Sequence, residues 1–149
     1  MIDIEYDEKQ IQEIADQFWK EVVQDMFNRS IKKSIILLQR YAIQETPTDQ
    51  WRLRNWFQTQ FKQSFGRLFN PVDYAIYVHD GTKPHTAPFD KIEWRANRHW
   101  LNPWSVRRAI RMKGTKANPF MDRAVDQWEK QVDGIFDAEV QKMVLQLNS

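Results

Sequence analysis

Apolar residues recur at steps of three and four positions over the first third of the chain. They are Ile11, Ile14, Phe18, Val22, Met26, Ile31, Ile35, Leu38 and Ala42. This spacing predicts a helix from Glu8 to Ile43, capped at its start by Asp7 and ended by Pro47. Such a helix would be about 54 Å long, so we expect a bend at the polar residues 28–30.

The C-terminal region shows the same helical spacing. Its apolar positions are Met121, Ala124, Val125, Trp128, Val132, Ile135, Phe136, Val140, Met143, Val144 and Leu147. Asn118-Pro119 is a helix start signal, because asparagine caps a helix and proline is tolerated at its first position. We expect a long helix from this signal to about Leu147. The same signal at Asn102-Pro103 predicts a shorter helix that ends at Lys113-Gly114.

Aromatic and polar residues alternate between Phe57 and Phe69, which is the period of a strand. Phe57, Phe61 and Phe65 also have the spacing of one helix face. We favour strand structure, because phenylalanine and threonine suit a pleated, half-buried surface. Gly66 is the expected turn.

The stretch from Val72 to Thr82 is dense in tyrosine and aliphatic residues. Tyr74, Tyr77 and Val78 would share one face of a short helix, which Gly81 would end. Tyrosines at this density suit a half-buried surface. The stretch is therefore either a connector that fills the core or a contact site.

The region from Lys83 to Trp104 contains three prolines and little periodicity. We expect a long loop there, with one short helical piece at Ile92–Ala96. Residues 1–149 are then a single α+β domain, in which long N-terminal and C-terminal helices pack on a small antiparallel sheet with a long loop region.

Composition adds an unusual surface to this fold. Aromatic residues make up 13% of the chain, including seven tryptophans, although the mean hydropathy is −0.72. Rings in such a polar chain suit a component of an assembly. There is no cysteine, no apolar run long enough to cross a membrane, and no signal-peptide pattern in the acidic start Met1–Glu5. We therefore expect a soluble protein made in the cytoplasm.

Charge is unevenly distributed, although the net charge is only +2. Residues 1–29 carry eight acids and three bases, and residues 119–149 carry six acids and three bases. Residues 91–116 carry eight bases against the single acid Glu93. A chain polarised in this way can pair head to tail with its own copies or present its middle to a negative surface.

Candidate chemistry is sparse. His79, Asp80 and His85 could supply two nitrogens and a carboxylate to a metal, but no second carboxylate lies close by in the sequence. No phosphate loop, catalytic triad or zinc-protease motif is present. We expect no catalysis, no metal and no cofactor. Trp94, Trp100 and Trp104 alternate with the bases, a pattern that suits either single-stranded nucleic acid or contacts within the core and between subunits.

Three segments occur in a fixed order. They are Thr46-Pro47-Thr48-Asp49 with Arg52-Leu53-Arg54-Asn55, then Tyr74-Ala75-Ile76-Tyr77-Val78-His79-Asp80-Gly81-Thr82, then Ile110-Arg111-Met112-Lys113-Gly114-Thr115-Lys116-Ala117-Asn118-Pro119-Phe120-Met121. In these segments and their order the chain resembles the tail-completion family of tailed bacteriophages, the neck proteins that join the tail to the head. Two departures stand out: Gln50-Trp51-Arg52 replaces a threonine-glycine turn, and His79 replaces a glutamate.

The resemblance implies an α+β fold and a hexameric ring around the channel through which DNA leaves, in the neck of the virion. Its partners would be a connector or head-closure protein on one face, and a tail terminator or tube on the other. The residues expected at subunit or partner contacts are Tyr74, Tyr77, Trp94, Trp100, Trp104 and Phe120. The basic residues expected to face the connector or the DNA are Arg107, Arg108, Arg111, Lys113 and Lys116. A tail-terminator or head-closure ring, a basic nucleic-acid-binding protein and a small nuclease remain the alternatives.

Overall fold

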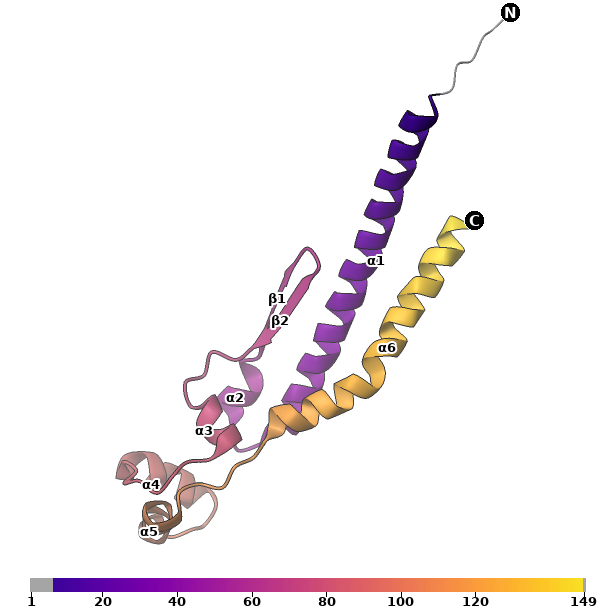
Figure 1. Ribbon diagram of the computed structural model, residues 1–149. Helices are drawn as coiled ribbons and strands as arrows, with labels where there is room; N and C mark the ends of the chain where they lie inside the picture. Colours follow the sequence, from indigo (N-terminus) through magenta and orange to yellow (C-terminus); the bar gives the residue numbers. More distant parts are fainter. Residues whose placement is uncertain (1–6, 149) are drawn as a thin grey trace, which may run out of the picture.

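The computed structural model of the protein describes residues 7–148 (Figure 1). The elements are α1 (Glu8–Glu45), α2 (Trp51–Asn55), β1 (Gln58–Lys62), β2 (Phe65–Phe69), α3 (Ala75–Asp80), α4 (Phe89–Arg98), α5 (Pro103–Lys113) and α6 (Phe120–Leu147). The predicted α+β class is confirmed, because two long terminal helices accompany a two-stranded antiparallel sheet. The expectation about a signal peptide at Met1–Glu5 lies outside the described residues.

Helix α1 is a straight rod that lies between the β-hairpin and α6 (Figure 1). It begins at the predicted cap, where the Asp7 carboxylate accepts a hydrogen bond of 3.0 Å from the amide of Lys9. The expected bend at residues 28–30 is wrong. Each of these polar residues has a partner: Asn28 accepts from the Ser64 amide, Arg29 pairs across to α6, and Ser30 donates to a carbonyl of its own helix. The polar interruption therefore does not break the helix.

Strands β1 and β2 form the predicted hairpin, in which Phe61 faces Gly66 across the ladder. Gly66 is not the turn, which falls between the strands at residues 63–64. It lies where β2 crosses α1, and a Cβ there would come within 2.7 Å of the side chains of both Ile31 and Ile35. Glycine is therefore needed for the close approach of strand and helix.

The main core lies where α1, α2, α3 and α6 meet. Its buried residues are Ala42, Leu53, Phe57, Val72, Phe120 and Ala124. The rings of Phe57 and Phe120 meet edge to face with their centroids 6.4 Å apart, an arrangement that aromatic pairs favour. Asn118 does not cap α6 as expected, because its side-chain oxygen accepts a hydrogen bond from Arg123 instead.

A second, smaller core holds α4 against α5. Ala87, Ile92 and Ala96 are buried there, and Val106 and Ile110 of α5 pack against them. The expected loop with a short helical piece at Ile92–Ala96 is thus a ten-residue helix. Proline at position 88 precedes this helix instead of interrupting it, and proline is tolerated at such a start. The predicted α5 is confirmed, with the Asn102 side chain capping it.

Polar contacts set the alignment of α6 along α1. Arg123 and Gln127 both donate to the Glu45 carboxylate, with the Arg123 contact at 2.7 Å. Further along, the Trp128 indole donates to the Ser34 carbonyl at 2.9 Å. The Arg123 guanidinium, with Gln127, lowers the pKa of Glu45. The two helices therefore run antiparallel in one register.

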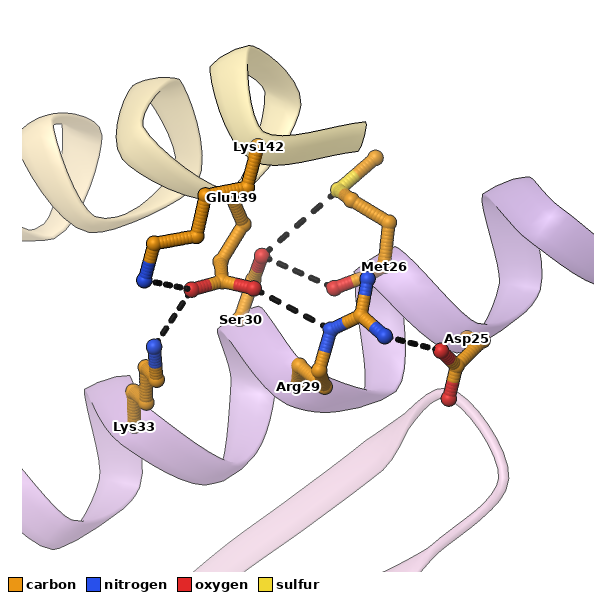
Figure 2. Close-up of polar contacts among 7 residues, drawn as sticks. All are labelled: Asp25, Met26, Arg29, Ser30, Lys33, Glu139 and Lys142. Carbon is orange, nitrogen blue, oxygen red and sulfur yellow. Dashed lines mark hydrogen bonds and ion pairs between the residues drawn. The ribbon is translucent and has the colours of Figure 1, made fainter. Parts of the chain in front are cut away.

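A buried carboxylate lies further along the α1–α6 interface, toward the C-terminal end of α6. Glu139 of α6 is only 2% exposed and pairs with Lys33 and Arg29 of α1 and with Lys142 of its own helix (Figure 2). This residue was not predicted from the sequence. Its place in the helical repeat could have indicated its burial. Val132, Phe136 and Glu139 recur at the apolar spacing of α6, and Glu139 is the charged residue of the three.

The partners of Glu139 control its ionisation. Hydrogen bonding by Lys33, with smaller contributions from Lys142 and Arg29, lowers the pKa of Glu139 from 4.5 to about 2, although burial opposes this change. The same carboxylate raises the pKa of Lys33. Glu139 is therefore charged at neutral pH, and a buried charge is tolerated only while it keeps its partners.

Replacing Glu139 by glutamine should lower the free energy of unfolding by about 2 kcal/mol at pH 7, because hydrogen bonds to charged groups contribute about 1.5–3 kcal/mol. The folded-state pKa lies below the ordinary value, so this contribution is complete above pH 4.5 and disappears as the pH falls toward 2. The gap between the wild-type chain and Glu139→Gln should narrow over that range in urea unfolding. Glu129→Gln, at an exposed position of α6, is the control. A gap that does not change with pH would contradict the assignment.

Candidate functional site

The most distinct surface of the molecule is carried by residues 83–113, which contain α4 and α5 and are here called the arm. The arm leaves the main core after Thr82 and returns at Gly114. At its base Thr82 and Thr115 pair as an antiparallel bridge, with amide-to-carbonyl distances of 3.1 and 3.2 Å. Their hydroxyls also lie 2.9 Å apart. These contacts close the arm into a loop, and we call them the clip.

Two glycines make the clip possible. Gly81 and Gly114 both have φ of 75°, a conformation that other residues adopt only under strain. A Cβ on Gly81 would lie 2.5 Å from the Thr115 carbonyl oxygen, and one on Gly114 would collide with the Thr82 carbonyl. Both glycines were predicted as helix ends, and in the structure the two helix ends touch.

An ion pair makes a second attachment between the arm and the rest of the chain. Arg95 of α4 donates to the Asp49 carboxylate at 2.7 Å, and His99 lies 3.7 Å from the same group. Asp49 belongs to the turn after α1. The arm is thus held at its base by the clip and along α4 by Asp49.

One face of α5 is basic. Trp104, Arg107, Arg108 and Arg111 recur at helical spacing and, with Thr86, line a pocket of about 260 Å³. The Arg107 guanidinium lies 6.0 Å from the centre of the Phe89 ring, which packs on Trp104 at 4.4 Å. None of the three arginines forms an ion pair with another of residues 7–148. Their charge is therefore available to an anion.

The other two predicted basic residues are exposed but lie away from this pocket. Lys113 is the last residue of α5, and Lys116 follows the clip on the way to α6. The structure thus brings three of the five predicted basic residues together and leaves the two lysines near the base of the arm.

The predicted aromatic contact residues divide into three groups. Trp94, Trp100 and Trp104 are 65%, 96% and 64% exposed on the arm, and Tyr77 is 60% exposed on α3. Tyr74 is half-buried against the main core. Phe120 is only 2% exposed and belongs to that core, so its assignment as a contact residue is wrong. Phe120 packs on Phe57 because α6 begins at the main core.

The candidate metal ligands do not come together. His79 lies 2.5 Å from Asp80 and 3.4 Å from Asp122, whereas the His85 ring lies 2.9 Å from the Lys83 carbonyl. Within residues 7–148 no three side chains of histidine, cysteine, aspartate or glutamate gather closely enough to hold a metal ion. His79 also packs edge to face on Phe120 at 5.4 Å. It therefore joins the end of α3 to the start of α6.

An apolar groove was not found from the sequence. It has a volume of about 640 Å³ and lies between α1, the hairpin turn and α6. Its lining residues are Trp19, Lys20, Val23, Gln24, Phe27, Ile31, Ser64 and Phe136. Trp19, Val23, Phe27 and Ile31 recur at steps of four, so a second apolar stripe on α1 was the available signal.

No protein-family model, curated protein or solved structure matches this chain. Among residues 7–148, none of the helices is sufficiently long and apolar to span a membrane.

Replacing Gly114 by alanine should destabilise the chain by about 3 kcal/mol, because the new Cβ needs a strained backbone and meets the Thr82 carbonyl. The matched control is Gly134→Ala in the middle of α6, where a Cβ would meet no atom within 4 Å. That variant should gain about 0.8–1 kcal/mol from helix propensity. Thermal and urea unfolding measure both, and a Gly114→Ala chain as stable as the control would contradict the role of the clip.

Proposed function

We propose that the chain is a structural virion protein of the phage neck, which completes the tail and joins it to the head connector as a ring around the DNA channel. The observation that carries the proposal is the amount of surface left uncovered. The chain exposes 11602 Å², against about 8,000 Å² expected for a compact monomer of 18.0 kDa. An isolated chain with so much surface is suited to burial against other chains.

The uncovered surface is also rich in large apolar side chains. Ile11, Ile14 and Phe18 are exposed on α1, where its first turns project beyond the end of α6 (Figure 1). Trp51 and Trp56 are exposed around α2, in addition to the tryptophans of the arm. Apolar surface on several sides supports contacts with more than one neighbour, as in a ring.

The three segments behind the family resemblance meet in the fold. Leu53 from the first segment, Val78 from the second and Phe120 from the third pack in or against the main core. The second and third segments are also joined by the clip, and the Asn118 amide donates to the Val78 carbonyl at 3.1 Å. Residues that depend on one another in this way would keep their order and spacing in a family, which supports the resemblance.

The basic face of the arm supports a location beside DNA or an acidic connector. Three unpaired arginines on one helix attract phosphate without reading sequence, which suits DNA that only passes through. The same face favours the alternative of a basic nucleic-acid-binding accessory protein. A tail-terminator or head-closure ring would use the same uncovered surface and is the alternative within the same machine.

The proposal is tested in a tailed phage that encodes this chain. A nonsense allele should yield DNA-filled heads and separate tails under the electron microscope, because each part assembles without the joint. Supplying the wild-type chain in trans should restore joined particles. Joined, infectious particles from the nonsense allele would refute the proposal.

Reversing Arg107, Arg108 and Arg111 to glutamate should reduce joined particles at least tenfold, because the basic face would repel DNA phosphates or an acidic connector. The melting temperature should change by less than about 3 °C, since Arg108 and Arg111 are exposed, Arg107 is half-buried with its guanidinium at the Phe89 ring, and surface substitutions have small effects on stability. The control reverses the exposed cations Lys9, Lys32 and Lys130, which changes the net charge equally. A triple variant that joins particles normally but no longer binds DNA would favour the nucleic-acid-binding alternative.

A further inference from the structure

Trp100 is placed where protein chemistry favours glycine. It follows α4 with φ of 56°, in the left-handed region that non-glycine residues rarely occupy. The Trp100 amide donates to the Asn97 carbonyl and the Leu101 amide to the Ala96 carbonyl, which is the Schellman pattern that usually ends in glycine. A bulky indole at this position is strained, and 96% of it is exposed.

The indole belongs to an apolar tip on the arm. Leu101 beside it is 55% exposed, and Trp94, six residues earlier on α4, is 65% exposed. Strained residues persist where the conformation has a use, and exposed apolar surface is costly unless another surface covers it. Trp100 and Leu101, here called the tip, therefore form apolar surface that is left uncovered within residues 7–148.

The apolar groove on α1 has the size and the exposed apolar lining to receive the tip. Its volume of about 640 Å³ lies in the range of about 300–1,000 Å³ that accommodates a bound side chain or small ligand. Trp19 and Phe27, which line it, are 51% and 42% exposed. The groove lies beside the hairpin turn, part-way along α1, whereas α4 and α5 lie beyond the C-terminal end of α1 (Figure 1). The tip therefore cannot reach the groove of its own chain.

The arm and the helix segments near the groove carry opposite net charges. Residues 89–113 of the arm carry seven bases and two acids. At the other end, residues 8–29 of α1 carry five acids and three bases, and residues 128–147 of α6 carry four acids and two bases. A basic arm approaching this acidic end is attracted, and the opposite charges orient the approach.

From these features we infer that the Trp100 tip of one copy docks into the α1 groove of a second copy of this chain. The contact joins two different surfaces, so it repeats from copy to copy and closes into a ring when the rotation between copies allows it. It deepens the proposed neck ring and rests on that proposal only in requiring self-assembly.

Nucleic acid is the less suitable occupant for the tip. The unpaired arginines surround Trp104, whose ring already packs on Phe89, and Trp100 is not among the residues that line their pocket. Leu101, the immediate neighbour of Trp100, offers no stacking surface to a base. An aromatic and an aliphatic side chain together fit an apolar groove better than a nucleotide.

The test uses two variants that remove opposite halves of the contact. Trp100→Ala loses the tip, and Val23→Arg fills the groove and repels the basic arm. By light scattering, each should need at least about tenfold more protein to assemble than the wild-type chain, as expected for a central contact. Mixed together, they should form a dimer of one chain of each kind, because the mixture contains one intact tip and one intact groove. Leu145→Ala, at an apolar side chain of α6 that is 69% exposed, is the control and should assemble normally.

Two kinds of result would overturn the inference. A Trp100→Ala chain that assembles like the control, with or without weaker binding to a single-stranded oligonucleotide, would show that the tip does not hold copies together. A wild-type chain that stays monomeric at millimolar concentration would also exclude the contact. Neither result would refute the neck function, which the nonsense allele tests separately, and circular-dichroism melts of both variants verify that they are folded.

Discussion

The alignment of α6 on α1 is the constraint on which the rest of the molecule depends. Glu139 fixes it, because a buried carboxylate accepts only a position in which Lys33 and Arg29 can reach it. A shift of α6 by one helical turn would leave this charge unpaired in an apolar interface, whereas aliphatic contacts alone would tolerate such a shift. The interface thus depends on a few polar contacts for its register and on apolar packing for most of its stability.

The register of α6 on α1 determines where the main core and the arm lie. With Glu45 paired to Arg123, α6 begins where Phe120 can cover Leu53 and Phe57. The segment that leads into α6 then lies beside the end of α3, so that Gly114 and Thr115 meet Thr82. The clip is therefore a consequence of the helix pair, and the arm that it closes is positioned indirectly by Glu139.

Local patterns predicted the elements that depend on local chemistry. The period of the apolar residues located α1, α5 and α6, and Asp7 and Asn102 cap their helices as expected. Prolines misled the prediction for residues 83–104, because a proline before a helix and one within a loop look alike when the packing of Ile92 and Ala96 is unknown. The prediction of a bend at residues 28–30 was wrong for a related reason. Ser64 and Glu139, the partners of Asn28 and Arg29, lie far from these residues in the sequence.

The exposed residues of the candidate site were easier to predict than its geometry. Charge density was sufficient to select Arg107, Arg108 and Arg111, but a motif could not separate Phe120, which supports the fold, from Trp100, which faces outward. The groove combines α1, the hairpin turn and α6, so no single segment reveals it. Because α1 is a straight rod and the arm is held by both the clip and Asp49, tip and groove keep a fixed separation and orientation within each chain. In a head-to-tail contact that orientation determines the rotation from one copy to the next, and so whether the copies close into a ring.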